Sequence, residues 1–368
     1  MASRIVRKPN SVVLLGAPTS AAASMAGTEK APERLRAAGL AGRLREAGLD
    51  VIDLGDAAAI PFQLDNENPR ARNLHNVLRG LESLRPLVEQ AIRTGALPLI
   101  LGGDGSIALA VLGALRHHHR ALSLFYMNRD AGLNVPATSP TGFIEDMIVA
   151  HVTGQGAAEL VRFWGDPPPV REPEIALFGV YRLDAPAAEW LSRSPMRCYL
   201  ADNLRDQSPA ESAQLALERI HGHQHGFLLH LDADLIIQNE AAGGDGPVLP
   251  GLDLAYLREA LVHLIKQPHL AAIEVTSYNP DGDGDGQFAE TLVTLLAEVL
   301  RARREDAESV ESAASPGPTV APEASPAATP VEAPVAASAP GSEGDLSAAR
   351  PSADSAPDED ETSGNLPA

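Results

Sequence analysis

Short apolar runs alternate with longer stretches of helical periodicity along most of this chain. The runs have the length of buried strands and are bounded by Gly, Pro and polar residues, and they cover residues 11–18, 51–56, 97–101, 121–126, 175–180, 197–200, 227–231 and 270–275. Apolar residues at helical spacing predict helices over residues 31–47, 74–92, 107–115, 186–193, 209–221 and 290–303. Strands separated by helices, without Asn-Gly hairpin turns between them, predict an α/β fold with a mainly parallel sheet of about eight strands covered on both faces.

Several of the predicted strands run directly into polar loops. The strand at residues 121–126 is followed by the run Met127 to Asn134, and the strand at residues 97–101 is followed by Gly102-Gly103-Asp104-Gly105-Ser106. The carboxyl ends of parallel strands share one edge of the sheet, where α/β proteins bind ligands. We therefore expect the functional site at this edge.

The composition changes sharply near residue 305. From Glu305 onward 13 side chains are acidic and only Arg350 is basic, and ten residues are proline. Such a segment has too little apolar surface to offset the entropy lost on ordering. We predict one domain over residues 1–304 and a disordered, Pro/Ala/Ser/Glu-rich acidic tail over residues 305–368. The tail holds −12 of the net charge of −20 and leaves the domain mildly acidic.

Charge and cysteine content restrict which partners the chain can bind and in which cellular compartment it is expected. No cluster of Lys and Arg is present in the predicted domain, so neither nucleic acid nor an anionic membrane surface is expected as a partner. The apolar run after the basic residues 1–10 spans only Val12 to Leu15, which is too short for a signal peptide or a membrane span. Cys198 is the single cysteine, so no intrachain disulfide can form. A cytoplasmic location is the expectation.

Many short motifs in one order resemble the arginase/agmatinase (ureohydrolase) family over roughly residues 11–301. They include Gly16-Ala17-Pro18, the segment 27–56 with Asp53-Leu54-Gly55-Asp56, the segment 97–106, and Asn134-Val135-Pro136 through Gly142. The resemblance implies a three-layer α-β-α sandwich and a site in which two Mn²⁺ hold a bridging hydroxide that attacks a guanidinium carbon. It also implies a trimer or hexamer. Hard oxygen ligands and imidazoles suit such a pair of ions.

The chain departs from the family at most of the expected metal ligands. Where the family has Gly-Gly-Asp followed by a ligand His, this chain has Gly105. Where the family has Asp-Ala-His-x-Asp, it has Asn128, Arg129, Asp130 and Gly132 in the corresponding run. Asn128 thus replaces a carboxylate, Asp130 replaces an imidazole, and Gly132 replaces the second carboxylate.

One ligand strand keeps the family pattern. Asp232 and Asp234 are spaced by two, which points both carboxylates to one face of an extended strand. We expect these two and Asp130 to be the remnant metal ligands, unoccupied or holding a single weak divalent cation together with Asn128. The alternative is that Arg129 or another nearby cation neutralises the leftover acids.

The remaining family positions concern catalysis and substrate. Glu145 stands at the position of the family's proton-shuttling His, and Ser277 stands at that of its substrate-binding Glu. The resemblance assigns Asp184 and Asn134 to substrate binding. No catalytic residue is therefore predicted with its family chemistry intact.

We interpret the chain as a catalytically degenerate arginase-family protein, a pseudoenzyme retained for binding or assembly, with no cofactor expected. Its expected partners are copies of itself or an active arginase-family paralogue. The first alternative is a metal-dependent C–N hydrolase of a guanidino compound resembling arginine or agmatine, which would release urea through a rebuilt site. The second is a sensor that binds a guanidino ligand through Asp184 and Asp232 without turnover.

A further acidic run, Asp281 to Gly286, matches the first half of a calcium-binding loop. Its twelfth position is Leu292, where such loops require a bidentate Glu. The run is instead predicted to be a solvated loop whose carboxylates cap the helix that follows it.

Overall fold

The computed structural model describes residues 7–119, 121–165, 167–181, 183–222, 224–236 and 251–314. Contacts divide the chain into Met1–Pro316 and Gly317–Ala368, and the second unit lies outside the described residues, as does most of the predicted tail. The fold below is that of the first unit.

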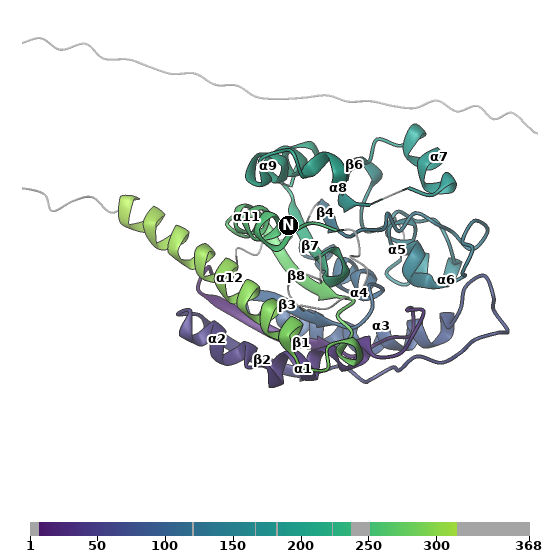
Figure 1. Cartoon of the computed structure of the whole chain (residues 1–368), viewed down its shortest axis with the longest axis horizontal. Helices are drawn as coiled ribbons and strands as arrows, with labels where there is room; N and C mark the ends of the chain where they lie inside the picture. Colours follow the sequence, from purple (N-terminus) through teal and green to yellow (C-terminus); the bar gives the residue numbers. More distant parts are fainter. Residues whose placement is uncertain are drawn as a thin grey trace, which may run out of the picture. The chain divides into compact units, whose positions relative to one another are not determined.

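Eight parallel strands form one sheet, in the order β2-β1-β3-β8-β7-β4-β5-β6 (Figure 1). Their bounds are β1 Ser11–Ala17, β2 Asp50–Asp56, β3 Leu97–Gly102, β4 Leu122–Met127, β5 Ile175–Val180, β6 Arg197–Leu200, β7 Gly226–Asp232 and β8 Leu270–Thr276. Each predicted strand is present, and the predicted parallel sheet of about eight strands is confirmed.

Helices connect the strands throughout. The α-helices in the described residues are α1 Ala31–Ala37, α2 Leu40–Glu46, α3 Leu74–Arg93, α4 Ile107–Leu115, α5 Ile148–Val152, α6 Ala158–Val161, α7 Ala185–Arg193, α8 Ala201–Leu204, α9 Pro209–Arg219, α11 Leu254–Ile265 and α12 Gln287–Ala314. Short 3-10 helices include η2 Ile144–Met147, η4 Ala233–Leu235 and η5 Pro280–Gly282.

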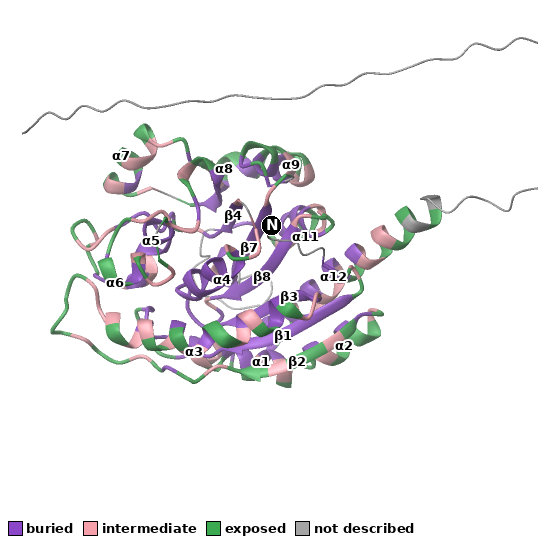
Figure 2. Ribbon diagram, turned by 180° about the vertical axis from the view of Figure 1, so that it is seen from behind, coloured by how far each residue is buried: buried purple, intermediate pink, exposed green. Residues whose placement is uncertain are grey.

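Successive side chains along the strands point to opposite faces of the sheet and pack into two separate hydrophobic cores. Val12 and Leu14 of β1 belong to the core beneath α1, α2, α9, α11 and α12, whereas Val13 and Leu15 belong to the core beneath α3, α4, α5 and α6. Figure 2 shows the buried strands between helices whose outer faces are exposed. The architecture is a three-layer α-β-α sandwich, as the sequence predicted.

Two helix predictions differ from the structure. The single helix expected over residues 31–47 is divided at Gly39, whose φ of 84° is left-handed and ends α1, because glycine adopts this conformation without a Cβ penalty. Helix α11 was not predicted. Its sequence signal is Asp253, whose side chain accepts a hydrogen bond from the Tyr256 N–H and caps the helix.

The boundary expected at residue 305 also differs. Helix α12 continues through Glu305 to Ala314, so residues 305–314 are helical rather than disordered. Two charged pairs four residues apart join the start of this segment to the preceding turn, Arg301 with Glu305 at 3.9 Å and Arg304 with Glu308 at 2.6 Å. Such pairs favour helix in a segment whose composition alone indicates disorder.

Candidate functional site

The carboxyl ends of the four central strands bring together the residues that the sequence singled out. Asp104 follows β3, Asn128 follows β4, Asp232 ends β7, and Ser277 follows β8. These strands are neighbours in the order β3-β8-β7-β4, so their ends meet at one place on the sheet edge. The predicted location of the site is consistent with this convergence.

Asp104 is fully buried and is occupied by internal hydrogen bonds. One carboxylate oxygen accepts from Thr19 Oγ1 at 3.1 Å and from the Ala22 N–H at 3.0 Å. The other accepts from Ser106 Oγ at 2.5 Å and from the Ser106 N–H at 3.0 Å. Burial raises the pKa of Asp104, and these four donors oppose that shift. Asp104 therefore ties together the loops after β1 and β3.

Asp232 is also buried and saturated with protein donors. Its Oδ2 accepts from Asn128 Nδ2 at 2.9 Å and from Ser277 Oγ at 2.6 Å. Its Oδ1 accepts from the Asp234 N–H at 2.8 Å, which caps η4. Burial raises the pKa of Asp232, while His230 and these donors favour the charged form.

Asp234 and Asp130 lie nearer to solvent than Asp232. The Arg129 guanidinium lies 3.5 Å from Asp234 Oδ2, and the two side chains are 28% and 39% exposed. Burial and the charge of Asp232 raise the pKa of Asp234 to about 7, while Arg129 opposes the shift. Asp130 is exposed, and its N–H donates to Asn128 Oδ1 at 2.8 Å.

Glu145 comes from η2 and joins the same cluster. Its Oε1 lies 3.4 Å from Ser277 Oγ, whose one hydrogen is directed to Asp232 at 2.6 Å, and the Gly105 N–H donates to Glu145. Burial raises the pKa of Glu145 well above its usual value, and the charges of Asp104 and Asp232 add to the shift. This carboxyl is therefore inclined to hold a proton, and it lies among the acids rather than pairing with a cation.

A buried pair that the sequence interpretation missed underlies this cluster. His230 Nδ1 lies 2.6 Å from Glu274 Oε1, and neither side chain is exposed. The His230 ring stacks on Tyr126 with centroids 4.3 Å apart, and Tyr126 OH accepts from Asn128 Nδ2 at 3.1 Å. The signal in the sequence was one polar residue inside each of the apolar strands β7 and β8.

The two glycines at former ligand positions differ in what they tolerate. A Cβ added at Gly105 would lie 3.7 Å from both His230 and Ile148, which is ordinary contact. Gly132 has a φ of 62°, and a Cβ there would lie 3.2 Å from Val149 atoms. A side chain at position 132 would therefore be strained by the backbone as well as crowded.

The two predicted substrate-binding residues contact each other. Asn134 Nδ2 donates to Asp184 Oδ2 at 2.8 Å, and Asp184 Oδ1 accepts from the Ala187 N–H at 2.8 Å as the N-cap of α7. Thr138 Oγ1 donates to Asn134 Oδ1 at 2.9 Å. Both side chains thus have internal partners, and a groove lined in part by Leu133, Thr138 and Trp190 lies beside them.

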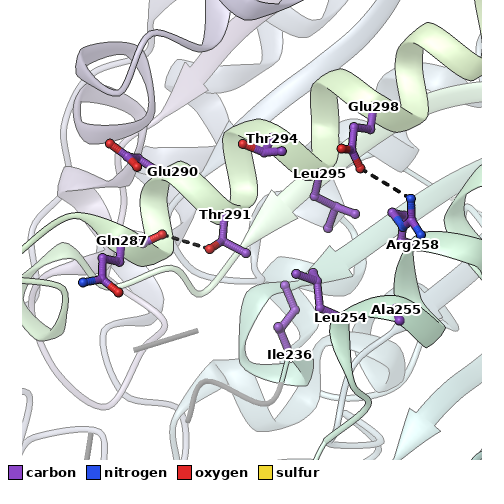
Figure 3. A pocket seen from close by; sticks show the side chains of 10 residues that line it. All are labelled: Ile236, Leu254, Ala255, Arg258, Gln287, Glu290, Thr291, Thr294, Leu295 and Glu298. Carbon is purple, nitrogen blue, oxygen red and sulfur yellow. Dashed lines mark hydrogen bonds and ion pairs between the residues drawn. The ribbon is translucent and has the colours of Figure 1, made fainter. Parts of the chain in front are cut away.

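A large pocket lies away from these residues. It has a volume of about 860 Å³ and lies between α11 and α12 (Figure 3). Its lining mixes apolar side chains with the Arg258–Glu298 ion pair at 3.9 Å. It contains none of the residues that the sequence identified as chemical, and we assign it no catalytic role.

Comparisons with known proteins agree with this architecture. The family model described as "Arginase family" matches residues 10–301. The chain belongs to the arginase family.

Arginase-family relatives match nearly their whole length. An arginase of Brevibacillus brevis is 28% identical over 78% of this chain and 96% of its own. The crystal structure of arginase from Bacillus subtilis superimposes with a TM-score of 0.70 at 27% identity, covering 79% of this chain and 98% of that one. The Bacillus caldovelox arginase structure gives a TM-score of 0.70 at 25% identity.

The donor set of this arginase-family chain differs from the one that the family resemblance implies for a pair of Mn²⁺. Asn128 and Ser277 present hydrogen-bond donors to Asp232, and a donor hydrogen cannot serve as a metal ligand. No imidazole stands at position 105 or 130. Among the described residues, no three His, Cys, Asp or Glu side chains converge as a group that could hold a metal ion.

Two further features concern membrane spans and the acidic run Asp281 to Gly286. No helix within the described ranges is long and apolar enough to cross a bilayer. Asp283 in the acidic run accepts from the N–H groups of Phe288 and Ala289 at the start of α12, as the predicted capping role requires.

Proposed function

We propose that this chain is an arginase-family protein without guanidino hydrolysis, retained for binding or for assembly. The observation that carries the proposal is the bonding of Asp232, whose Oδ2 accepts from both Asn128 Nδ2 and Ser277 Oγ. In a dinuclear centre that oxygen would have to face metal ions. Here it faces two protein donors within 3 Å, which occupy the positions around this oxygen that an ion would need.

The charge balance of the cluster supports the same proposal. Two Mn²⁺ would bring four positive charges, and the family meets them with several carboxylates and imidazoles. Asp232 and Asp234 remain, with Asp130 exposed beside them, and Arg129 already neutralises part of their charge. Glu145 favours its protonated form and adds little to cation binding.

The competing function is a metal-dependent hydrolase of a guanidino compound that works through a rebuilt site. The observation that favours it is the match to arginases over 96% of the Brevibacillus brevis protein, since every main segment of an arginase is present. This function requires the donors on Asp232 to turn away and admit an ion.

Metal analysis and a urea-release assay separate the two functions. The protein is prepared without chelator, incubated with Mn²⁺ and desalted, and its metal content is measured. Arginine, agmatine and related guanidines are then tested for urea. We expect well under one Mn²⁺ per chain and no urea above the rate in buffer. Close to two tightly held Mn²⁺ per chain together with urea release would overturn the proposal.

A variant of the same chain provides the matched control. Gly105→His, Asn128→Asp and Asp130→His together restore three family ligands, and position 105 has room for a Cβ. Adding two imidazoles and removing a donor from Asp232 should tighten Mn²⁺ binding by at least about tenfold, since changes at metal ligands and their supporting residues shift affinity by about 10- to 100-fold. Unchanged affinity would mean that these loops are not aligned with the family's ligand loops.

Assembly is the role that we propose in place of catalysis. The family relationship supports a homo-oligomer or a mixed oligomer with an active arginase-family paralogue as the form of that assembly. Thermal stabilisation by arginine or agmatine without product would favour the alternative role of a guanidino-ligand sensor.

A further inference from the structure

Arg129 takes a position that the sequence comparison alone does not explain. In the family motif this position carries a small Ala, whereas here it carries a guanidinium 3.5 Å from Asp234 Oδ2. The side chain is only 28% exposed, so most of it is covered by the protein rather than extending into solvent.

The backbone around Arg129 is held on both sides. The Tyr181 N–H donates to the Arg129 carbonyl at 2.8 Å, and the Asn128 N–H donates to the Phe178 carbonyl at 3.2 Å. The next residue is held by the Asp130 N–H bond to Asn128 Oδ1. A fixed backbone restricts where the guanidinium can go, which lowers the entropy lost when it pairs with the acid.

The surrounding acids need such a cation. Asp232 is buried and Asp234 is half-buried, and both lie close to Glu145 and to each other. Uncompensated carboxylates in such a place repel one another and lose solvation on folding. In the family this role falls to metal ions, and the donor set here does not fit them.

We propose that Arg129 is a built-in cation that fills the acidic centre in place of metal ions, so that the site is occupied by the protein's own guanidinium. The centre keeps its negative charges, and Arg129 blocks an external cation from reaching them. Removing Arg129 therefore creates a vacancy that an external guanidinium ion or Mn²⁺ can enter. This inference rests on the proposed absence of a dinuclear centre.

The test measures thermal stability of Arg129→Ala with small cations. The probes are guanidinium chloride at about 5–20 mM, MnCl₂ at about 1–5 mM, and NaCl at matched ionic strength. We expect the melting temperature of the variant to rise by about 2–4 °C with guanidinium or with Mn²⁺ over the NaCl control, as a ligand at roughly ten times its Kd produces. The wild-type protein should show no such rise.

Two control variants test whether the cation response comes from the space and charge left by Arg129. Arg304→Ala removes an arginine that is 22% exposed and is paired with Glu308, far along α12 from this cluster. It should show no cation-specific rise. Arg129→Lys keeps a positive charge at the site and should remain close to wild type in its response to both probes.

A second readout does not depend on ligand binding. Arg129→Gln removes the positive charge and loses less side-chain volume than Arg129→Ala. Asp234→Asn removes the negative charge of the acid that Arg129 pairs with. If Arg129 compensates Asp234, Asp234→Asn should stabilise the Arg129→Gln variant by more than it stabilises the wild-type protein, because only in the variant has this acid lost its cation. Absence of this difference would overturn the inference, as would equal cation responses in Arg129→Ala and Arg304→Ala.

The outcomes also separate this inference from the proposed function. Urea release with two Mn²⁺ in the wild-type protein would refute the proposed function. A silent wild-type protein whose Arg129→Ala variant gains no cation response would refute the built-in cation alone.

Discussion

Replacing Asn128 with Asp tests the hydrogen-bond account of the site most directly. In the wild-type protein Asn128 Nδ2 donates to Asp232 Oδ2 at 2.9 Å and to Tyr126 OH at 3.1 Å. Asn128→Asp keeps the shape of the side chain and restores the family's residue. It removes the donor and sets a second carboxylate against Asp232. The contact with Tyr126 survives, because the phenol can donate to the new carboxylate.

The magnitude follows from the two losses. A hydrogen bond to a buried charged group contributes about 1.5–3 kcal/mol. Two like charges about 4 Å apart repel by about 4 kcal/mol at an effective dielectric constant near 20, and uptake of a proton by the pair limits this cost. We expect the free energy of unfolding to fall by about 3–5 kcal/mol at pH 8, which is a large share of the stability of a typical domain.

The pH dependence has a definite sign. Two adjacent carboxyls share a proton, so the folded-state pKa of the pair lies above its unfolded value. The stability of the variant is therefore highest below the unfolded pKa and is lost as the pH rises through the folded pKa. The difference between Asn128→Asp and wild type should be smaller at pH 5 than at pH 8, measured by urea unfolding in metal-free buffer.

Asn134→Asp serves as the matched control for this prediction. Asn134 Nδ2 donates to Asp184 Oδ2 at 2.8 Å, so the chemical change and the distance are similar. Asp184 is exposed, however, and solvent screens the new repulsion. The control should lose less than about 1 kcal/mol. Equal losses in the two variants, or wild-type stability in Asn128→Asp, would show that Asp232 does not depend on its internal donors.

Two further predictions concern groups around and beyond the cluster. The pKa of Asp234 is raised to about 7, so its contribution to stability should be lost as the pH rises from about 4 through 7. Asp234→Asn should flatten the pH dependence of the urea midpoint between pH 5 and 8, and an unchanged slope would contradict the assignment. Asp283→Ala removes the acceptor for the Phe288 and Ala289 N–H groups and should lower the free energy of unfolding by about 1–2 kcal/mol. Asp281→Ala, which breaks only the exposed ion pair with Lys30, should cost under about 1 kcal/mol, and equal effects would contradict the capping role.

The strands could be predicted from sequence because each is a short apolar run ended by Gly, Pro or polar residues. The division at Gly39 was missed although the spacing carries a signal. Leu40 and Leu44 are four residues apart and share one face of a helix, but Leu35 and Leu40 are five residues apart, which is about 140° around a continuous helix. All three are buried, so the helix axis must change between them, and the left-handed Gly39 makes that change.

The site shows a similar division. The missing ligands at positions 105 and 132 are visible in the sequence, because each stands within a motif of fixed spacing. Their replacement by new contacts is not visible. Asn128 reaches Asp232 and His230 reaches Glu274 across neighbouring strands, and no local pattern joins residues so far apart in the chain. The sheet order that makes them neighbours is a property of the whole fold.

The acids that match the family pattern also accept hydrogen bonds that hold loops and a helix end in place, and these roles need no metal. Asp104 joins Thr19, Ala22 and Ser106, and so holds two loops on the sheet edge. Asp232 caps η4 through the Asp234 N–H. Removing either would leave buried donors without an acceptor, at a cost of about 1–3 kcal/mol each.

The glycine at position 132 has gone further from the family than any retained acid. Its left-handed φ of 62° and the close approach that a Cβ would make to Val149 oppose a side chain there. The acids that match the family pattern, by contrast, have hydrogen-bonding roles within this fold. Retained carboxylates in this fold are therefore weak support for a working centre, whereas a donor hydrogen aimed at such a carboxylate argues strongly against one.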